Sequence, residues 1–215
     1  MKAITRKYDV LLPVGISFYI LQGLGYVFDV YKGKVSIEKN FLKYALFLSF
    51  FPQLVAGPIE RTDNLMVQLE KPHKVTWDDF RKAILWILYG LFCKMVIADR
   101  IAIVVENVYD APQIYTGPYI MYAAMLFSFQ IYCDFSGYSD MAIGLGKMFG
   151  FTFPENFDYP YISKNVTEYW RRWHMTLGGW FRDYLFYPVM RSKLITKLTK
   201  ALKKSGHKTA AKNIP

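Results

Sequence analysis

Two long apolar stretches constrain this chain more than any other feature of its sequence. Residues 10–31 contain about 20 mostly apolar positions, which is enough helix to cross a bilayer. Residues 83–105 form a second such stretch, and residues 119–133 are apolar and aromatic. Residues 41–57 are apolar but short for a span, so we expect a re-entrant or interfacial segment there. The pattern predicts an all-α, polytopic membrane protein.

Composition supports this class and excludes several others. Of the 215 residues, 53% are hydrophobic and 18% aromatic, so a disordered chain is excluded because this much apolar surface must be buried. The two cysteines lie far apart, which excludes a disulfide-stapled fold. The three histidines have no His or Cys partner at ligand spacing, so we predict no metal site.

The positive charge of the chain is concentrated near its end. The formal net charge is +10, and residues 191–212 carry eight basic side chains and no acidic one. A basic cluster beside apolar segments is typical of a cytoplasmic flank that faces anionic lipid. Nucleic-acid binding is the competing interpretation, and we do not favour it because no nucleic-acid motif accompanies the charge.

Charged side chains inside the apolar stretches are the first candidates for function, because charges at membrane depth pair, line cavities or do work. For Lys94, Asp99 and Arg100 we favour a helix end whose basic side chains reach the interface. For Asp134 and Asp140 a structural and a functional role are equally expected, because short carboxylates cannot reach far toward water.

The segment TEYWRRWHMTLGGWFRD, residues 167–183, is the richest in reactive side chains. We predict a short amphipathic helix over residues 167–180, on which Trp170, Trp173 and His174 share one face. A histidine in an aromatic, poorly hydrated pocket stays neutral and can accept a proton. The alternative, a histidine that only hydrogen-bonds a neighbouring backbone group, stays open on composition alone.

Several strings, taken in order, resemble the membrane-bound O-acyltransferase (MBOAT) family, and specifically its bacterial alginate O-acetylation (AlgI-like) branch. They include FFPQLVAGPIER at residues 50–61 and EYWRRWHMTLGGWFRDYLFYPV at residues 168–189. The others are PVGISFYILQGLGYVFDVYKG, KMVIADRIA and QIYCDFSGYSDMAIGLGKMFGFTFPENFDYPY, at residues 13–33, 94–102 and 130–161. Several blocks in the family's order are far more specific than any one motif.

The resemblance implies a ring of many helices around a funnel, with re-entrant segments, in the inner (plasma) membrane of a bacterium. Residues 1–190 correspond to the central part of that transmembrane domain, and residues 191–215 to a truncated basic cytoplasmic loop. The family carries a second, invariant histidine on a later apolar helix. Its position falls beyond Pro215, so we expect this chain to be the middle of a longer enzyme.

The resemblance also implies an O-acyltransferase that moves an acyl group, usually acetyl, from a cytoplasmic thioester toward an extracytoplasmic polysaccharide. The implied donor is acetyl-CoA or an acyl carrier, and the implied partner is an extracytoplasmic acyltransferase; no bound cofactor is expected. D-alanyl transfer to teichoic acid and an inactive fragment are the alternatives. A transporter is less favoured, because the sequence has no inverted repeat.

His174 matches a functional position of the family and is implied to assist the later histidine, which is the base. We expect Trp170 and Trp173 to line the funnel, with Asp134, Ser136 and Asp140 as its polar wall. Three arginines are expected to attract an anionic donor. Pairing of these arginines with Glu168 or Asp183 is an equally good expectation. The arginines are Arg171, Arg172 and Arg182.

Overall fold

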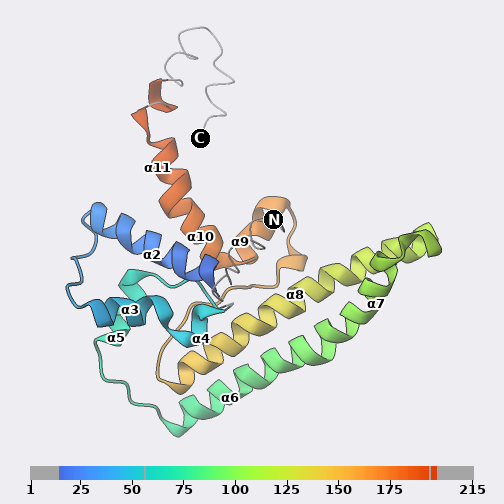
Figure 1. Cartoon of the computed structure of the whole chain (residues 1–215), viewed down its shortest axis with the longest axis horizontal. Helices are drawn as coiled ribbons and strands as arrows, with labels where there is room; N and C mark the ends of the chain where they lie inside the picture. The colour runs from blue at the N-terminus through green and yellow to red at the C-terminus, as the bar shows by residue number, and fades with distance from the viewer. Residues whose placement is uncertain (1–14, 56, 194, 198–215) are drawn as a thin grey trace, which may run out of the picture.

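The computed structural model describes residues 15–55, 57–193 and 195–197, and the regular elements in these ranges are all helical (Figure 1). A long two-helix hairpin extends to one side. Shorter helices from the beginning and end of the described chain pack beside one of its ends. This agrees with the all-α prediction.

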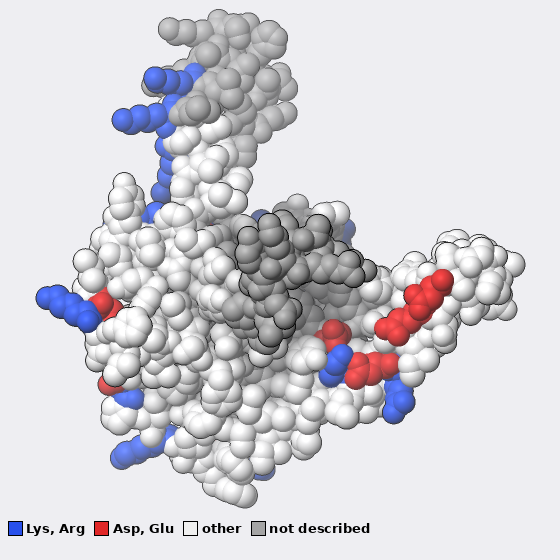
Figure 2. All heavy atoms as spheres, viewed as in Figure 1, with Lys and Arg blue, Asp and Glu red and all other residues white. Residues whose placement is uncertain are grey.

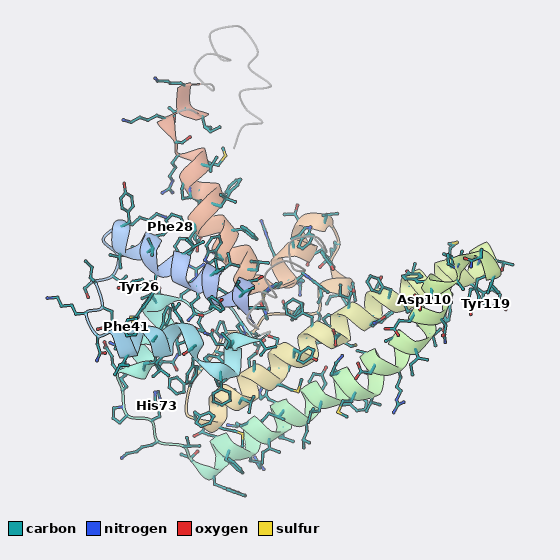
Figure 3. All side chains as sticks on the ribbon, viewed as in Figure 1. Tyr26, Phe28, Phe41, His73, Asp110 and Tyr119 are labelled. Carbon is teal, nitrogen blue, oxygen red and sulfur yellow. The ribbon has the colours of Figure 1, made fainter. Side chains whose placement is uncertain are left out.

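One arm of the hairpin is a nearly continuous helix, formed by α6 (Trp77–Leu91), the π-helical segment η2 (Phe92–Ala98) and α7 (Asp99–Asp110). Thr76 begins it with a capping box, in which its hydroxyl accepts the backbone N–H of Asp79 at 3.2 Å. After the short helix η3 (Pro112–Ile114), the 32-residue α8 (Gly117–Met148) returns antiparallel. Asp110 and Tyr119 mark the tip of the hairpin, far from His73 (Figure 3).

The two arms approach closely where a glycine of one faces a glycine of the other. A Cβ atom added to Gly137 would lie 2.7 Å from the carbonyl oxygen of Gly90, and one added to Gly90 would lie 2.4 Å from that of Gly137. Backbones that meet at this distance leave no room for any side chain. The contact is typical of helices that pack through small residues in lipid.

A first group of short helices covers the far end of α8. It consists of α2 (Ile16–Tyr31), α3 (Phe41–Ser49), α4 (Phe51–Leu54), η1 (Thr62–Met66) and α5 (Val67–Leu69). Their shared core joins α3, η1, the end of α8 and the loop that follows α8. It is built from Phe47, Phe50, Leu65, Met66, Ile143, Phe151 and Phe153.

The second group follows α8 and contains η4 (Pro160–Ile162), α9 (Val166–Arg172), α10 (Met175–Trp180), η5 (Phe181–Phe186) and α11 (Tyr187–Met190). Two long-range hydrogen bonds hold it against α2. Trp180 donates to the carbonyl of Leu21 at 2.8 Å, and the Tyr184 hydroxyl donates to Asp29 at 2.6 Å. These contacts fix α10 and η5 beside the first group.

The prediction of one helix over residues 167–180 is wrong. The helix breaks between α9 and α10, where His174 has φ +44° and ψ +57°. Hydrogen bonds from a distant loop replace those that would continue the helix: the Met175 N–H donates to the Asn156 carbonyl at 2.9 Å, and the Arg172 carbonyl accepts from the Asp158 N–H at 2.9 Å. The face that Trp170, Trp173 and His174 were expected to share therefore does not exist.

The predicted apolar segments have mixed outcomes. Residues 83–105 lie within the α6–η2–α7 arm, so Lys94 stands in its middle and the helix-end interpretation is wrong. Residues 41–57 are broken at Phe50 into α3 and α4, and their re-entrant path stays a prediction.

Some of the predictions concern residues outside the described ranges. Residues 10–14 of the first predicted span and residues 198–215 of the basic tail are among them. Among the helices that the structure describes, none combines the length and the hydropathy needed to cross a membrane.

Candidate functional site

The side chain of His174 is held by one buried amide. Its Nδ1 lies 2.9 Å from Oδ1 of Asn156, a residue that is 1% exposed. The same Oδ1 accepts the backbone N–H of Thr176 at 3.3 Å and its hydroxyl at 2.9 Å. A backbone N–H can only donate, so this atom must be the amide oxygen, and Nδ1 of His174 must carry a proton. The Nε2 atom of His174 then keeps its lone pair.

Aromatic rings surround the imidazole. The ring of Phe135, on α8, meets it edge-on at 4.7 Å, and the ring of Phe157 lies parallel to it at 6.4 Å. Burial among these groups lowers the pKa of His174 to about 4, so the ring is neutral at neutral pH. A neutral imidazole with a free Nε2 can accept a hydrogen bond or a proton. The alternative of a histidine bonded only to backbone is wrong, because the partner of His174 is a side chain.

The two tryptophans expected in the funnel lie in different surroundings. Trp173 joins the aromatic cluster near His174, with its ring 5.1 Å from Phe157 and stacked on Tyr169 at 5.7 Å. Trp170 is 61% exposed and lines a groove instead. Trp170 lies within α9, whereas Trp173 is the residue at which α9 ends.

A groove of about 1460 Å³ runs along α9, α10, η5 and α11. Its lining is mainly apolar, with Arg171 and Arg182 as its charged groups. A smaller cavity of about 390 Å³ shares Met175, Gly179 and Arg182 with the groove, and Thr176 and Glu60 also line it. The groove is lined by Thr167, Trp170, Arg171, Met175, Gly178, Gly179, Phe181, Arg182, Leu185, Phe186, Tyr187, Val189 and Met190.

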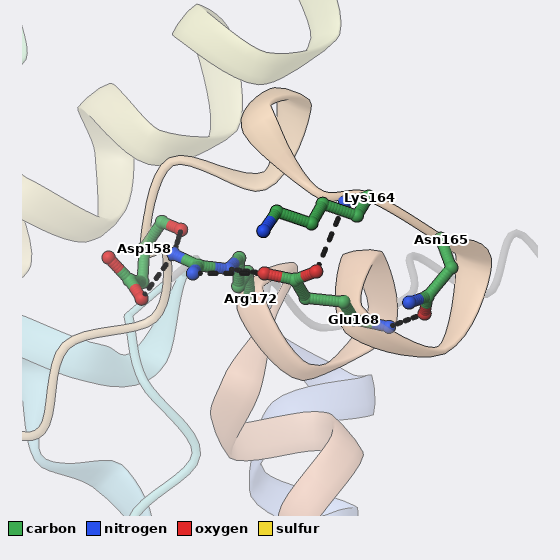
Figure 4. Close-up of polar contacts among 5 residues, drawn as sticks. All are labelled: Asp158, Lys164, Asn165, Glu168 and Arg172. Carbon is green, nitrogen blue, oxygen red and sulfur yellow. Dashed lines mark hydrogen bonds and ion pairs between the residues drawn. The ribbon is translucent and has the colours of Figure 1, made fainter.

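The three candidate arginines have distinct environments. Arg172 is fully engaged: it donates to the Asp158 carboxylate at 2.8 Å and to Glu168 at 3.1 Å, and so ties α9 to the loop before it (Figure 4). Arg182 donates to Asp183 at 3.0 Å, but it also lines the groove. Within the described ranges, no hydrogen bond or ion pair engages Arg171. Pairing with Glu168 or Asp183, one of the two expectations, is found for two of the three.

Within the described ranges, no hydrogen bond joins His174 to Asp134, Ser136 or Asp140 of α8. Asp134 turns to Lys94, with 2.6 Å between Oδ1 and Nζ, and Lys94 also contacts Asp99 at 2.6 Å. Ser136 is buried and Asp140 is half-buried. The α8 side chain that meets His174 is Phe135. A polar wall built from Asp134, Ser136 and Asp140 therefore stays a prediction, and Asp134 already has a structural partner.

Sequence reasoning missed Asn156 and Thr176, which hold His174 in place. No spacing rule joins Asn156 to a histidine 18 positions later, because the contact depends on how the loop after α8 folds back. The one local signal is a polar Asn in an otherwise aromatic and proline-containing loop, FPENFDYP. In the part of the chain that the structure describes, no cluster of three or more His, Cys, Asp or Glu side chains could hold a metal ion.

Comparison with known proteins now decides the family. A family model described as MBOAT, membrane-bound O-acyltransferase family, matches residues 38–202, which include Asn156 and His174. The chain belongs to the membrane-bound O-acyltransferase family. The resemblance drawn from the sequence strings is thereby confirmed.

Three relatives show the range of this similarity. The chain is 45% identical to the probable alginate O-acetylase AlgI of Pseudomonas putida, over 84% of its own length and 37% of the relative's. It is 35% identical to the peptidoglycan O-acetyltransferase of Helicobacter pylori, over 83% and 39%. It is 30% identical to the teichoic acid D-alanyltransferase of Bacillus subtilis, over 83% and 46%. The chain thus spans less than half the length of these relatives.

Proposed function

We propose that this MBOAT chain forms the central part of an O-acyltransferase that moves an acetyl group from a thioester donor toward an extracytoplasmic polysaccharide. The observation that carries the proposal is the neutral His174, whose Nδ1 is bound to Asn156 and whose Nε2 has no hydrogen-bond partner among the described residues. The relatives support it, because two of those compared are named as O-acetylating enzymes of bacterial polymers.

Acyl transfer to a hydroxyl needs a group that orients the hydroxyl and a base that takes its proton. The Nε2 atom of His174 accepts the hydrogen bond of the acceptor hydroxyl and points its oxygen at the thioester carbonyl. The oxygen then bonds to the carbonyl carbon and the carbon–sulfur bond breaks. The hydroxyl proton moves along its hydrogen bond to Nε2 of His174 and from there to the departing sulfur, which leaves with the donor as a thiol.

The groove along α9–η5–α11 is the proposed donor site. Its apolar lining suits a pantetheine arm, and Arg171 and Arg182 suit donor phosphates. Arg172 is left out of this role, because Asp158 and Glu168 occupy its guanidinium. Both acetyl-CoA and an acylated carrier protein present such an arm.

We further propose that the hairpin lies in the inner membrane as part of a multi-pass ring around a funnel, with residues 41–57 re-entrant. Figure 2 shows charged side chains in a few small groups with broad uncharged surface between them. The Lys94–Asp134 ion pair makes the charges of the hairpin tolerable in that setting. Exposed large apolar side chains line the hairpin, including Leu85, Leu88, Phe92, Met95, Met121, Met125 and Phe129.

The acetyl group would pass to an extracytoplasmic partner acyltransferase before it reaches the polymer. D-alanyl transfer to teichoic acid is the second candidate, favoured by the 30% identity to the Bacillus subtilis enzyme. It differs in the group transferred, so the acyl content of the polymer separates the two. The two candidate donors are distinguished in the same way: an acyl carrier makes transfer depend on a phosphopantetheinylated protein, and acetyl-CoA does not.

The test replaces His174 with Ala in the intact protein and measures ester-bound acetate and D-alanine on the cell's polymers. We expect His174→Ala to abolish one of them, with the membrane level of the protein unchanged. His73→Ala is the matched control, since His73 hydrogen-bonds the Gln68 carbonyl at 2.8 Å and packs on Phe151, and within the described ranges it does not contact His174. Unchanged acetate and D-alanine in the His174 variant would overturn the proposed function.

A further inference from the structure

Asn156 accepts the hydrogen bonds that fix the conformation around His174. Its side-chain oxygen receives His174 Nδ1 and both donors of Thr176, and its backbone carbonyl receives the Met175 N–H. Asn156 comes from the loop after α8, whereas the three residues that it holds form the start of α10. One buried side chain therefore sets both the backbone turn at His174 and the direction of its ring.

We propose that Asn156 is a positioning residue that locks His174 in the Nδ1–H tautomer and so presents the Nε2 lone pair to the acceptor hydroxyl. The inference rests on the proposed function of His174. It explains why Nε2 of His174 accepts a hydrogen bond from the substrate and does not donate one. Of the two neutral tautomers, only this one leaves Nε2 able to accept.

The amide orientation is determined by its neighbours. Turning the amide over would place its NH₂ group against the Thr176 N–H, which can only donate. In the observed orientation the amide oxygen accepts from three donors, and Nδ2 of Asn156 is buried with no hydrogen-bond partner among the described residues. A buried N–H group without a partner is unfavourable, so the three bonds to Oδ1 must outweigh its cost.

A neutral partner matters for the chemistry as well as the geometry. Within the described ranges, the side chains that contact the imidazole are Phe135 from α8 and Phe157 and Asn156 from the following loop, and all three are uncharged. Arg172, the nearest arginine in sequence, is turned to Asp158 and Glu168. A carboxylate in place of Asn156 would keep the hydrogen bond but favour the protonated imidazolium, which has no free lone pair.

The backbone at His174 also depends on Asn156. His174 occupies the left-handed region, which a non-glycine residue adopts at a cost of about 1–2 kcal/mol. The bonds from Met175 and Thr176 to Asn156 hold the chain there. Loss of Asn156 would therefore free both the ring tautomer and the backbone that carries it.

The tautomer can be measured without activity, by nitrogen-15 NMR of the intact protein labelled at histidine. Signals absent from His174→Gln identify those of His174. We expect the wild-type spectrum to show a protonated Nδ1 and an unprotonated Nε2. In Asn156→Leu, which keeps the volume but removes the acceptor, we expect a mixture of tautomers and a kcat lower by about 10- to 100-fold, with donor KM little changed.

Asn156→Asp is the second variant, and it stays informative if the leucine variant does not fold. It keeps an acceptor for Nδ1 and the Thr176 donors, so we expect the single tautomer to persist. The acid limb of its pH–rate profile should move to higher pH, because the carboxylate stabilises the imidazolium. His73, whose ring packs on Phe151 at 4.3 Å and which hydrogen-bonds the Gln68 carbonyl, serves in the same spectra as a second histidine that, within the described ranges, has no hydrogen bond to Asn156.

The failure of this inference is distinct from failure of the proposed function. An Asn156→Leu protein with the wild-type His174 tautomer would overturn the positioning role, whatever its activity. So would an Asn156→Asp enzyme whose acid limb does not move. Full acyl transfer by His174→Ala would instead overturn the proposed function, and would leave the tautomer measurement standing as a structural fact.

Discussion

The helical hairpin and the junction between α9 and α10 are held together by different interactions. The hairpin is regular, mostly apolar on its surface, and closed by the direct approach of Gly90 and Gly137. The junction is irregular, with a left-handed histidine held by a buried amide from another loop. In the hairpin, the close approach of the two backbones decides the packing, although polar side chains such as Ser136 and Ser139 are also buried there. At the junction, hydrogen bonds decide the geometry, and the reactive group is placed there.

This difference predicts where the molecule tolerates change. The hairpin, which is held by close backbone contact, should lose stability when a larger side chain enters that contact, even if no polar group is changed. A site held by hydrogen bonds should lose activity before it loses stability. The predictions below test this division, beginning with the largest expected effect on stability.

Gly137→Val should destabilise the protein by about 3 kcal/mol, because its Cβ would lie 2.7 Å from the Gly90 carbonyl oxygen and the arms would have to separate. Gly117→Ala is the matched control, since its Cβ would enter open space at the start of α8. Thermal unfolding of the intact protein in detergent measures both. Equal melting temperatures for the two variants would contradict the close-approach account of the hairpin.

Glu60 should make the stability of the protein depend on pH, because its carboxyl is buried outside the apolar hairpin. This residue is 2% exposed in the loop between α4 and η1, and burial raises its pKa from 4.5 to about 7. Between these values the folded state holds the proton that the unfolded chain has lost, so stability should fall as pH rises from about 4.5 to 7.

Glu60→Gln should remove that slope. At pH 8 the variant should be the more stable by on the order of 2–3 kcal/mol, and at pH 4 the two should be alike. Denaturation at both pH values measures this, with Glu155→Gln, in the loop after α8, as the comparison. A Glu60→Gln protein no more stable than wild type at pH 8 would show that burial of the ionised Glu60 carboxylate does not destabilise the folded state.

Arg171 and Arg172 are adjacent and should behave differently. Arg172→Met loses ion pairs to Asp158 and Glu168 and should cost about 1 kcal/mol of stability, while donor KM stays constant. Arg171→Met should leave stability unchanged and raise donor KM, because this side chain lines the groove. Melting curves and donor titrations of both variants decide the assignment. A raised donor KM in the Arg172 variant alone would reverse it.

Local pattern predicted the helical class and the apolar stretches that became the hairpin, and the functional role of the segment around His174 stays a prediction. These features depend on residues near one another in sequence. The break at His174 could not be predicted, because its cause is the bonding of Met175 and Thr176 to Asn156 in a distant loop. The middle position of Lys94 was misjudged for a similar reason: its partner Asp134 lies on the other arm.

The candidate site was predicted in part. His174 stood out because a histidine among tryptophans and arginines is rare, and the family strings contain it. The three arginines are alike in sequence, and only the positions of Asp158, Glu168 and Asp183 separate Arg172 from the others. Helical spacing places Trp170 and Trp173 on one face, but Trp170 lines the groove and Trp173 joins the aromatic cluster.

The most direct test of this account is acetyl transfer in membrane vesicles that contain the intact protein. Labelled acetyl-CoA is supplied on the cytoplasmic side, and label is counted on the acceptor at the opposite face, for wild type, His174→Ala and His73→Ala. The account predicts transfer by wild type and His73→Ala, and none above background by His174→Ala. Equal transfer by all three proteins would contradict the claim that His174 presents the acceptor to the acyl group.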